Sequence, residues 1–150
     1  MPISADLPPQ PGTYILLLEM VEDQAVSIGK LGTFNLVRGW YAYIGSAFGS
    51  GGLRGRLTHH LTPPARPHWH IDYLRTAATV REVWTVASRT PYEHVWAERL
   101  LALPDATIPI SRFGAPDCRC AAHLFRFAER PLLAEFQTFN PEIAITGWQP

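Results

Sequence analysis

The run of residues 39–61 combines three features that suit a phosphate-bearing substrate. Tyr43 lies near the end of a predicted strand, a glycine-rich turn follows it, and Arg54 and Arg56 lie just beyond the turn. The planar guanidinium of arginine is suited to bidentate contact with phosphate. His60 shares a face of the predicted helix with Arg56, because residues four apart are neighbours on a helix surface. This run is therefore the first candidate for a functional site.

Two residues outside this run, Tyr14 and Glu93, have side chains that can complete such a site. A phenol can act as a general base when a nearby cation lowers its pKa from about 10, and Arg56 is a candidate for that cation. Glu93 offers a hard oxygen ligand of the kind that Mg²⁺ binds. Each residue also has an ordinary structural role, since tyrosines pack half-buried at sheet edges and a glutamate complements the amino end of a helix.

Short strands and helices are predicted to position these residues. Apolar runs predict strands over residues 13–20, 40–44, 79–86 and 124–127. Helical spacing and capping residues predict helices over residues 52–61, 68–75 and 90–103, the last with Thr90 as N-cap and Pro91 as its first residue. The first strand is almost wholly apolar, which predicts a central strand that is buried on both faces.

The composition is that of one ordinary globular domain. The chain has 150 residues, 47% of them hydrophobic and 17% charged, and its formal net charge is zero. A neutral protein does not coat nucleic acid by bulk electrostatics, but four arginines within residues 51–75 form a local basic patch. High-GC codon usage is an alternative explanation for the excess of arginine over lysine. Neither a secretory signal nor an apolar run of membrane-spanning length is present, so we expect a cytoplasmic location without membrane contact.

Cys118, Cys120 and His123 have the residue types of zinc ligands. The cysteines are two residues apart, which is unfavourable for a disulfide and tighter than the usual spacing of zinc-binding cysteine pairs. Two interpretations of the cysteines stay open: they are reduced cytoplasmic thiols, or they are metal ligands. In the second case His94 or His70 is a further ligand of a structural Zn²⁺, although free cysteines are more often small buried hydrophobes.

His68, His70 and Asp72 offer two imidazoles and a carboxylate within five residues. Residues two apart do not share a helical face, so a metal site formed by the two histidines would require an extended backbone. We therefore expect a His–Asp hydrogen bond within a network that holds the fold.

In their order along the chain, these motifs resemble those of the GIY-YIG nuclease family. Gly12-Thr13-Tyr14 corresponds to the first signature, with Thr in place of Ile, and Tyr43-Ile44-Gly45 matches the second signature letter for letter. Arg56 with His60, and Glu93 in a segment with Trp in place of Leu, follow as the remaining family motifs. The closer resemblance is to a branch whose members are sometimes fused to an endonuclease III-type repair enzyme. It is carried by the phrases YILLLE, GKLG, YAYIGSA, GGLRGRL, HWHIDYLR and FGAPDCRCAAHLF.

The resemblance implies an α+β fold, with a small central antiparallel sheet flanked by helices and an inserted hairpin between the two signature strands. It covers about residues 11–128, which leaves residues 1–10 as an N-terminal extension and residues 129–150 as a C-terminal tail. The aromatic residues of the tail leave two placements open, one on the domain itself and one on a second subunit of a homo-oligomer. The inserted hairpin is expected to reshape or cover the site.

The resemblance also implies a DNA endonuclease that hydrolyses phosphodiester bonds with Mg²⁺ or Mn²⁺, in DNA repair or on branched or damaged DNA. By that analogy, Tyr14 is the base and Tyr43 positions the scissile phosphate or the water. Arg56 stabilises charge on the phosphoryl oxygens, and His60 assists as a hydrogen-bond partner or proton donor. Glu93 holds the metal. The fusions imply a repair glycosylase as a functional partner.

Two other functions stay open. The first is a catalytically inactive module of the same fold that binds nucleic acid or a protein partner, which the neutral net charge favours. The second is a thiol enzyme that uses Cys118 or Cys120 together with His123.

Overall fold

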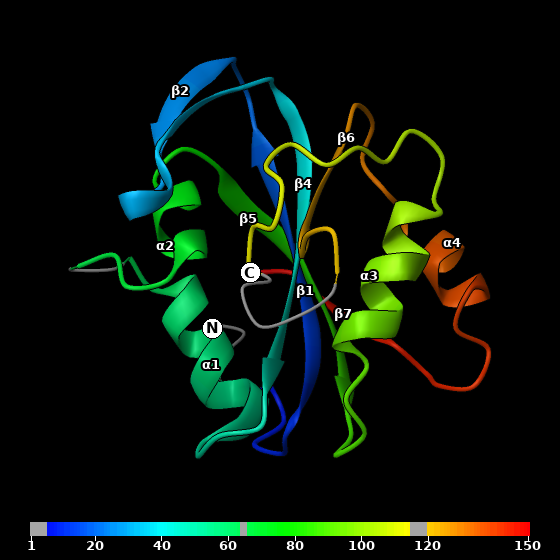
Figure 1. Cartoon of the computed structure of the whole chain (residues 1–150). Helices are drawn as coiled ribbons and strands as arrows, with labels where there is room; N and C mark the ends of the chain where they lie inside the picture. Colours follow the sequence, from blue (N-terminus) through cyan, green and yellow to red (C-terminus); the bar gives the residue numbers. More distant parts are fainter. Residues whose placement is uncertain (1–5, 64–65, 115–119) are drawn as a thin grey trace.

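The chain folds into strands and helices in the order shown in Figure 1, a computed structural model that describes residues 6–63, 66–114 and 120–150. The strands are β1 (Gly12–Met20), β2 (Gln24–Ser27), β3 (Thr33–Leu36), β4 (Gly39–Ala47), β5 (Thr79–Ala87), β6 (Leu124–Phe127) and β7 (Thr146–Trp148). The helices are α1 (Gly52–Leu61), α2 (His70–Leu74), α3 (Glu93–Leu101) and α4 (Leu133–Thr138), and one 3-10 turn spans Gly29–Leu31.

Five of the strands form one antiparallel sheet in the order β6-β4-β1-β5-β7, and β2 and β3 form a separate hairpin. Helices α1 and α2 cover one face of the sheet, and α3 and α4 cover the other (Figure 1). This arrangement confirms the predicted α+β class, with a central antiparallel sheet, flanking helices and an inserted hairpin.

Strand β1 is central and buried on both faces, as its apolar sequence predicts. Side chains alternate along a strand, so Tyr14 and Leu16 pack on the α1 side, whereas Ile15 and Leu17 pack on the α3 side. Neighbouring strands on both sides complete the backbone hydrogen bonds of β1. A nearly continuous apolar sequence is typical of a strand whose two faces are both covered.

The hairpin of β2 and β3 lies at the Met20 end of β1, away from Tyr14. Its buried residues join the core on the α1 and α2 side of the sheet, and the hairpin packs against α2. Gly29 permits this approach: its φ is +50°, and a Cβ there would lie 3.2 Å from the ring of Tyr73. The inserted hairpin thus covers the far end of the sheet, and the expectation that it covers the Tyr14 region is not met.

Helix α3 begins at Glu93, and the prediction of a start at Pro91 after an N-cap at Thr90 is wrong. The backbone N–H of Tyr92 donates to the Thr13 hydroxyl at 3.3 Å, and the first helical bond runs from Trp96 to the Tyr92 carbonyl at 2.8 Å. This contact with β1 fixes the start of the helix, and no local capping rule could have revealed it.

The C-terminal tail docks on the domain. Phe136 of α4 stacks on Trp84, with ring centroids 5.5 Å apart, and β7 pairs with β5 at the edge of the sheet. The indole of Trp148 donates to the hydroxyl of Thr85 at 2.8 Å. Among the residues that the structure describes, no helix has the length and apolar character needed to cross a membrane.

Candidate active site

A phenol and an imidazole from different elements meet at the centre of the site. Tyr14 of β1 and His60 of α1 are both buried, and Tyr14 Oη lies 2.7 Å from His60 Nε2. Tyr14 lies across Gly45 of the neighbouring strand β4, because the two residues are directly paired. A Cβ at position 45 would lie 2.3 Å from Tyr14 Oη, so only glycine leaves room for the phenol. The glycine of the Tyr-Ile-Gly motif is thus explained by the ring that it accommodates.

Tyr43 lies beside this pair and lines a pocket. Its ring centroid is 6.5 Å from that of Tyr14 and 6.3 Å from that of His60. The pocket has a volume of about 310 Å³ and is lined by Tyr43, His68, Trp69, His70 and Gly114. These aromatic and imidazole side chains offer stacking surfaces and hydrogen-bonding groups next to the two phenols.

Ser46 connects the cation of the site to its carboxylate. Arg56 Nη1 donates to the carbonyl oxygen of Ser46 at 3.0 Å, and the hydroxyl of Ser46 donates to Glu93 Oε2 at 3.5 Å. The Arg56 guanidinium also lies over the ring of Trp69, 4.7 Å from its centroid. A guanidinium held in this way is positioned before any substrate arrives.

The sheet edge explains why residues from both faces of the sheet can meet here. Strand β6 pairs with β4 only as far as Tyr43, opposite Leu124. One further backbone bond, from Ile44 to the carbonyl of His123 at 2.9 Å, follows before β4 becomes an edge. Ser46 lies on this edge, where α1 approaches from one face and the start of α3 from the other.

The electrostatics keep both phenols protonated near neutral pH. Burial raises the pKa of Tyr14 well above its ordinary value, the neighbouring Tyr43 adds to the rise, and Arg56 opposes it. Burial likewise raises the pKa of Tyr43, with the Glu93 charge acting in the same direction and Arg56 against it. Because Glu93 and Arg56 act on both phenols, the four groups share one electrostatic environment.

His60 is neutral at physiological pH. Burial lowers its pKa to about 3, and the positive charge of Arg75 contributes in the same direction. A protonated phenol next to a neutral imidazole implies that the Tyr14 hydroxyl donates and His60 Nε2 accepts. The five residues predicted from sequence, Tyr14, Tyr43, Arg56, His60 and Glu93, therefore lie in one site.

Of the two arginines that follow the glycine-rich turn, Arg56 is the one that acts on the phenols. Arg54 Nε donates to the carbonyl of Leu7 at 2.8 Å and so holds the N-terminal segment, away from the phenols.

The predicted His–Asp network also forms, but with His59 in place of His68 or His70 as the histidine side chain. Asp72 is fully buried, and its carboxylate lies 3.1 Å from His59 Nε2.

Three site residues were missed at the sequence level: Thr13, Ser46 and Trp69. Thr13 replaces the isoleucine of the first signature and orients the start of α3 through the Tyr92 N–H. Ser46 directly follows the Tyr-Ile-Gly motif, and that adjacency was the available signal. Trp69 covers the Arg56 guanidinium, a contact that its position in the sequence does not indicate.

Glu93 is a suitable ligand for the Mg²⁺ or Mn²⁺ that the resemblance implies. Its side chain is 25% exposed, and Oε2 lies 3.5 Å from the Ser46 hydroxyl, a second hard oxygen donor. Mg²⁺ is commonly bound by one or two carboxylates, with waters and substrate phosphates completing its coordination. The residues present therefore fit the ion.

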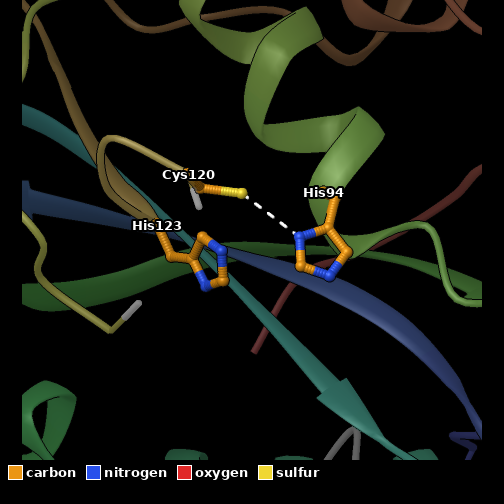
Figure 2. Close-up of side chains that lie close together, drawn as sticks. All are labelled: His94, Cys120 and His123. Atoms are coloured by element: carbon orange, nitrogen blue, oxygen red, sulfur yellow. Dashed lines mark hydrogen bonds between the residues drawn. The ribbon is translucent and has the colours of Figure 1, made fainter. Parts of the chain in front are cut away.

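Of the predicted zinc ligands, Cys120 and His123 lie close together, whereas Cys118 lies outside the described residues. His94 of α3 joins them: its Nδ1 is 3.3 Å from Cys120 Sγ (Figure 2). His70, the other proposed ligand, instead packs its ring against Phe113, with centroids 5.7 Å apart.

Comparisons with known proteins identify one family. A family model described as a domain of unknown function, DUF123, matches residues 13–144. Searches of curated proteins and of solved structures each found no match to this chain.

Proposed function

This chain belongs to the DUF123 family, and we propose that it is a metal-dependent endonuclease of GIY-YIG type that hydrolyses phosphodiester bonds in DNA. The observation that carries the proposal is the contact of 2.7 Å between Tyr14 Oη and His60 Nε2, made beside Arg56 and Glu93. Phosphodiester hydrolysis requires an activated water, neutralisation of phosphoryl charge and an anchored metal. The site offers one residue or pair for each requirement.

The Tyr14–His60 pair serves as the base. Burial keeps Tyr14 protonated, so the phenol can accept a proton from the attacking water only if it passes its own proton on. The neutral His60 Nε2 is in position to take that proton. Burial disfavours the resulting imidazolium, so His60 is a weak base and holds the proton only while the water attacks the phosphate.

Arg56 and Glu93 act on the phosphate. Arg56 is fixed by the Ser46 carbonyl and the Trp69 ring, and a guanidinium has further N–H groups that can donate to phosphoryl oxygens. Glu93 would hold Mg²⁺ or Mn²⁺, which when bound polarises the phosphate and stabilises the leaving oxygen. Tyr43, at the pocket wall, contacts the substrate beside these groups.

A cleavage screen tests the proposal. Single-stranded, nicked, flapped and branched DNA are incubated with the protein in Mg²⁺ or Mn²⁺, and parallel reactions contain excess EDTA. Cleavage of at least one substrate that depends on the metal supports the proposal. Cleavage that persists unchanged in EDTA contradicts it.

A second function, a binding module that does not cleave, is favoured by one observation. Tyr14 is only 1% exposed, so the phenol reaches substrate only if neighbouring side chains move aside. This function predicts Mg²⁺-independent binding of DNA with no cleavage of any substrate in the screen. The same experiment therefore separates the two functions.

A further inference from the structure

Three side chains that commonly bind metal point toward one another beside the candidate active site (Figure 2). They are His94, Cys120 and His123, and one ligand atom from each lies within 4.8 Å of the other two. His94 belongs to the first turn of α3, whereas Cys120 and His123 precede β6. Two segments that are distant in the sequence thus bring two imidazoles and a thiol to one place.

The separations approach those of a tetrahedral zinc site. Zinc–nitrogen bonds of about 2.0–2.1 Å and zinc–sulfur bonds of about 2.3 Å place neighbouring donor atoms about 3.3–3.7 Å apart. His94 Nδ1 and Cys120 Sγ are already at 3.3 Å. The remaining separations are at most 4.8 Å, which small side-chain rotations can close.

A backbone frame holds Cys120 and His123 in position. His123 N donates to the carbonyl of Phe113 at 2.8 Å, and Arg112 N donates to the carbonyl of Ala121 at 2.7 Å. The Arg112 guanidinium donates to the Cys120 carbonyl at 2.7 Å. This contact adds a side-chain anchor to the backbone of Cys120.

We propose that His94, Cys120 and His123 form a mononuclear Zn²⁺ site. One thiolate and two imidazoles are a donor set that zinc accepts, and three protein ligands leave a coordination position for a further group. His94 is exposed, Cys120 is half-buried and His123 is buried. The ion therefore enters from the solvent side, at His94.

The zinc site shares a carboxylate with the candidate active site. His123 Nδ1 lies 3.3 Å from Glu93 Oε1, so in the proposed site Nε2 of His123 is the nitrogen that binds the ion. A carboxylate on the far nitrogen of a ligating histidine fixes the orientation of that ring. Zinc binding thus restrains Glu93 through His123, and the catalytic consequence of this link rests on the function proposed above.

A second group of side chains, His59, His60 and Asp72, has similar spacing but is a weaker candidate. Asp72 already accepts from the backbone N–H of Trp69 at 2.9 Å and lies within hydrogen-bonding distance of His59. His60 Nε2 is bonded to Tyr14. A metal there would have to displace these buried hydrogen bonds.

Zinc binding is measured on full-length protein without a histidine tag, because a tag would compete for the metal. The protein is stripped with a chelator, and Zn²⁺ is then titrated in competition with a chromophoric chelator. Co²⁺ is titrated separately, since a thiolate ligand gives a charge-transfer band and a tetrahedral site gives intense visible bands. The ligand variants are Cys120→Ser and His94→Ala. The controls are His59→Gln in the second group and His68→Ala at an exposed histidine.

We expect one Zn²⁺ per chain, a thiolate-to-cobalt band, and affinities at least about tenfold lower in both ligand variants. The two controls should stay within about twofold of wild type. Glu93→Gln should weaken zinc binding by about tenfold, because it replaces the carboxylate beside His123 Nδ1 with a neutral amide.

Three results would overturn the proposal: no zinc bound by the wild type, full affinity in Cys120→Ser, or loss of binding in His59→Gln alone. Unchanged zinc affinity in Glu93→Gln would overturn the link to the active site. None of these measurements requires DNA cleavage. Their outcome therefore does not depend on whether the protein is a nuclease.

Discussion

Replacing Gly45 with alanine tests the packing that brings Tyr14 to His60. The added Cβ would lie 2.3 Å from Tyr14 Oη and 2.4 Å from Tyr14 Cζ, and atoms cannot approach so closely. The phenol is fully buried, so it can move only by displacing its neighbours. We therefore expect the substitution to shift the ring and break its hydrogen bond with His60.

The expected cost follows from two terms. Overpacking a close-packed core typically costs about 1–3 kcal/mol. Losing the net contribution of one hydrogen bond costs about 0.5–1.5 kcal/mol more. Together they lower the free energy of unfolding by about 1.5–4.5 kcal/mol, which corresponds to a decrease in Tm of about 3–18 °C for a domain of this size.

The assay is chemical and thermal denaturation followed by circular dichroism, with Gly55→Ala as the matched control. Outside its own helix and among the residues that the structure describes, a Cβ at Gly55, in α1, meets only the Ser50 carbonyl oxygen, at 3.7 Å. Alanine in a helix is favoured over glycine by about 0.5–1 kcal/mol, so this variant should be slightly stabilised. A Gly45→Ala variant within about 0.5 kcal/mol of wild type would refute the packing argument, since the predicted overpacking alone exceeds that value.

Two further predictions concern stability. Thr13→Val removes the acceptor of the Tyr92 N–H and should lower the free energy of unfolding by about 1 kcal/mol in urea denaturation, and unchanged stability would contradict the anchoring of α3. Burial lowers the pKa of His60 to about 3 in the folded chain, below the ordinary value of about 6.5. The unfolded chain then binds the additional proton, so stability should fall as the pH decreases from about 6.5 toward 3, by up to about 1.4 kcal/mol per pH unit. His60→Asn should flatten this pH dependence, and a slope equal to that of wild type would show that other groups cause it.

The apolar character of β1 and the ordered motifs made the sheet and the site predictable from sequence. Residues 14–18 are apolar without interruption, which is typical of a strand that is covered on both faces. Tyr14 and Gly45 could be placed on adjacent strands from their motifs, and the clash at Gly45 explains why these two motifs occur together. The local sequence predicted these two positions because each residue belongs to a strand with a recognisable apolar pattern.

What could not be predicted depends on contacts between distant segments. The start of α3 is set by Thr13, far earlier in the chain, and not by the capping residues beside it. The tail has little periodicity of its own, yet Phe136 is fully buried against Trp84. The same holds for His94 and Cys120, which approach only because α3 and the segment before β6 meet at the edge of β4. Such pairings are decided by tertiary packing, which composition and spacing do not encode.

The most direct test of the central claim compares DNA cleavage by wild type, Tyr14→Phe and Tyr41→Phe under single-turnover conditions with Mg²⁺ or Mn²⁺. Both tyrosines are buried, on adjacent strands of the sheet, but the Tyr41 hydroxyl donates to the Val37 carbonyl, away from His60. Loss of a positioned acid or base typically costs about 100-fold or more in rate, so we expect that loss for Tyr14→Phe and near wild-type cleavage for Tyr41→Phe. Equal cleavage rates for Tyr14→Phe and wild type, in folded protein, would contradict the assignment of the Tyr14–His60 pair as the base.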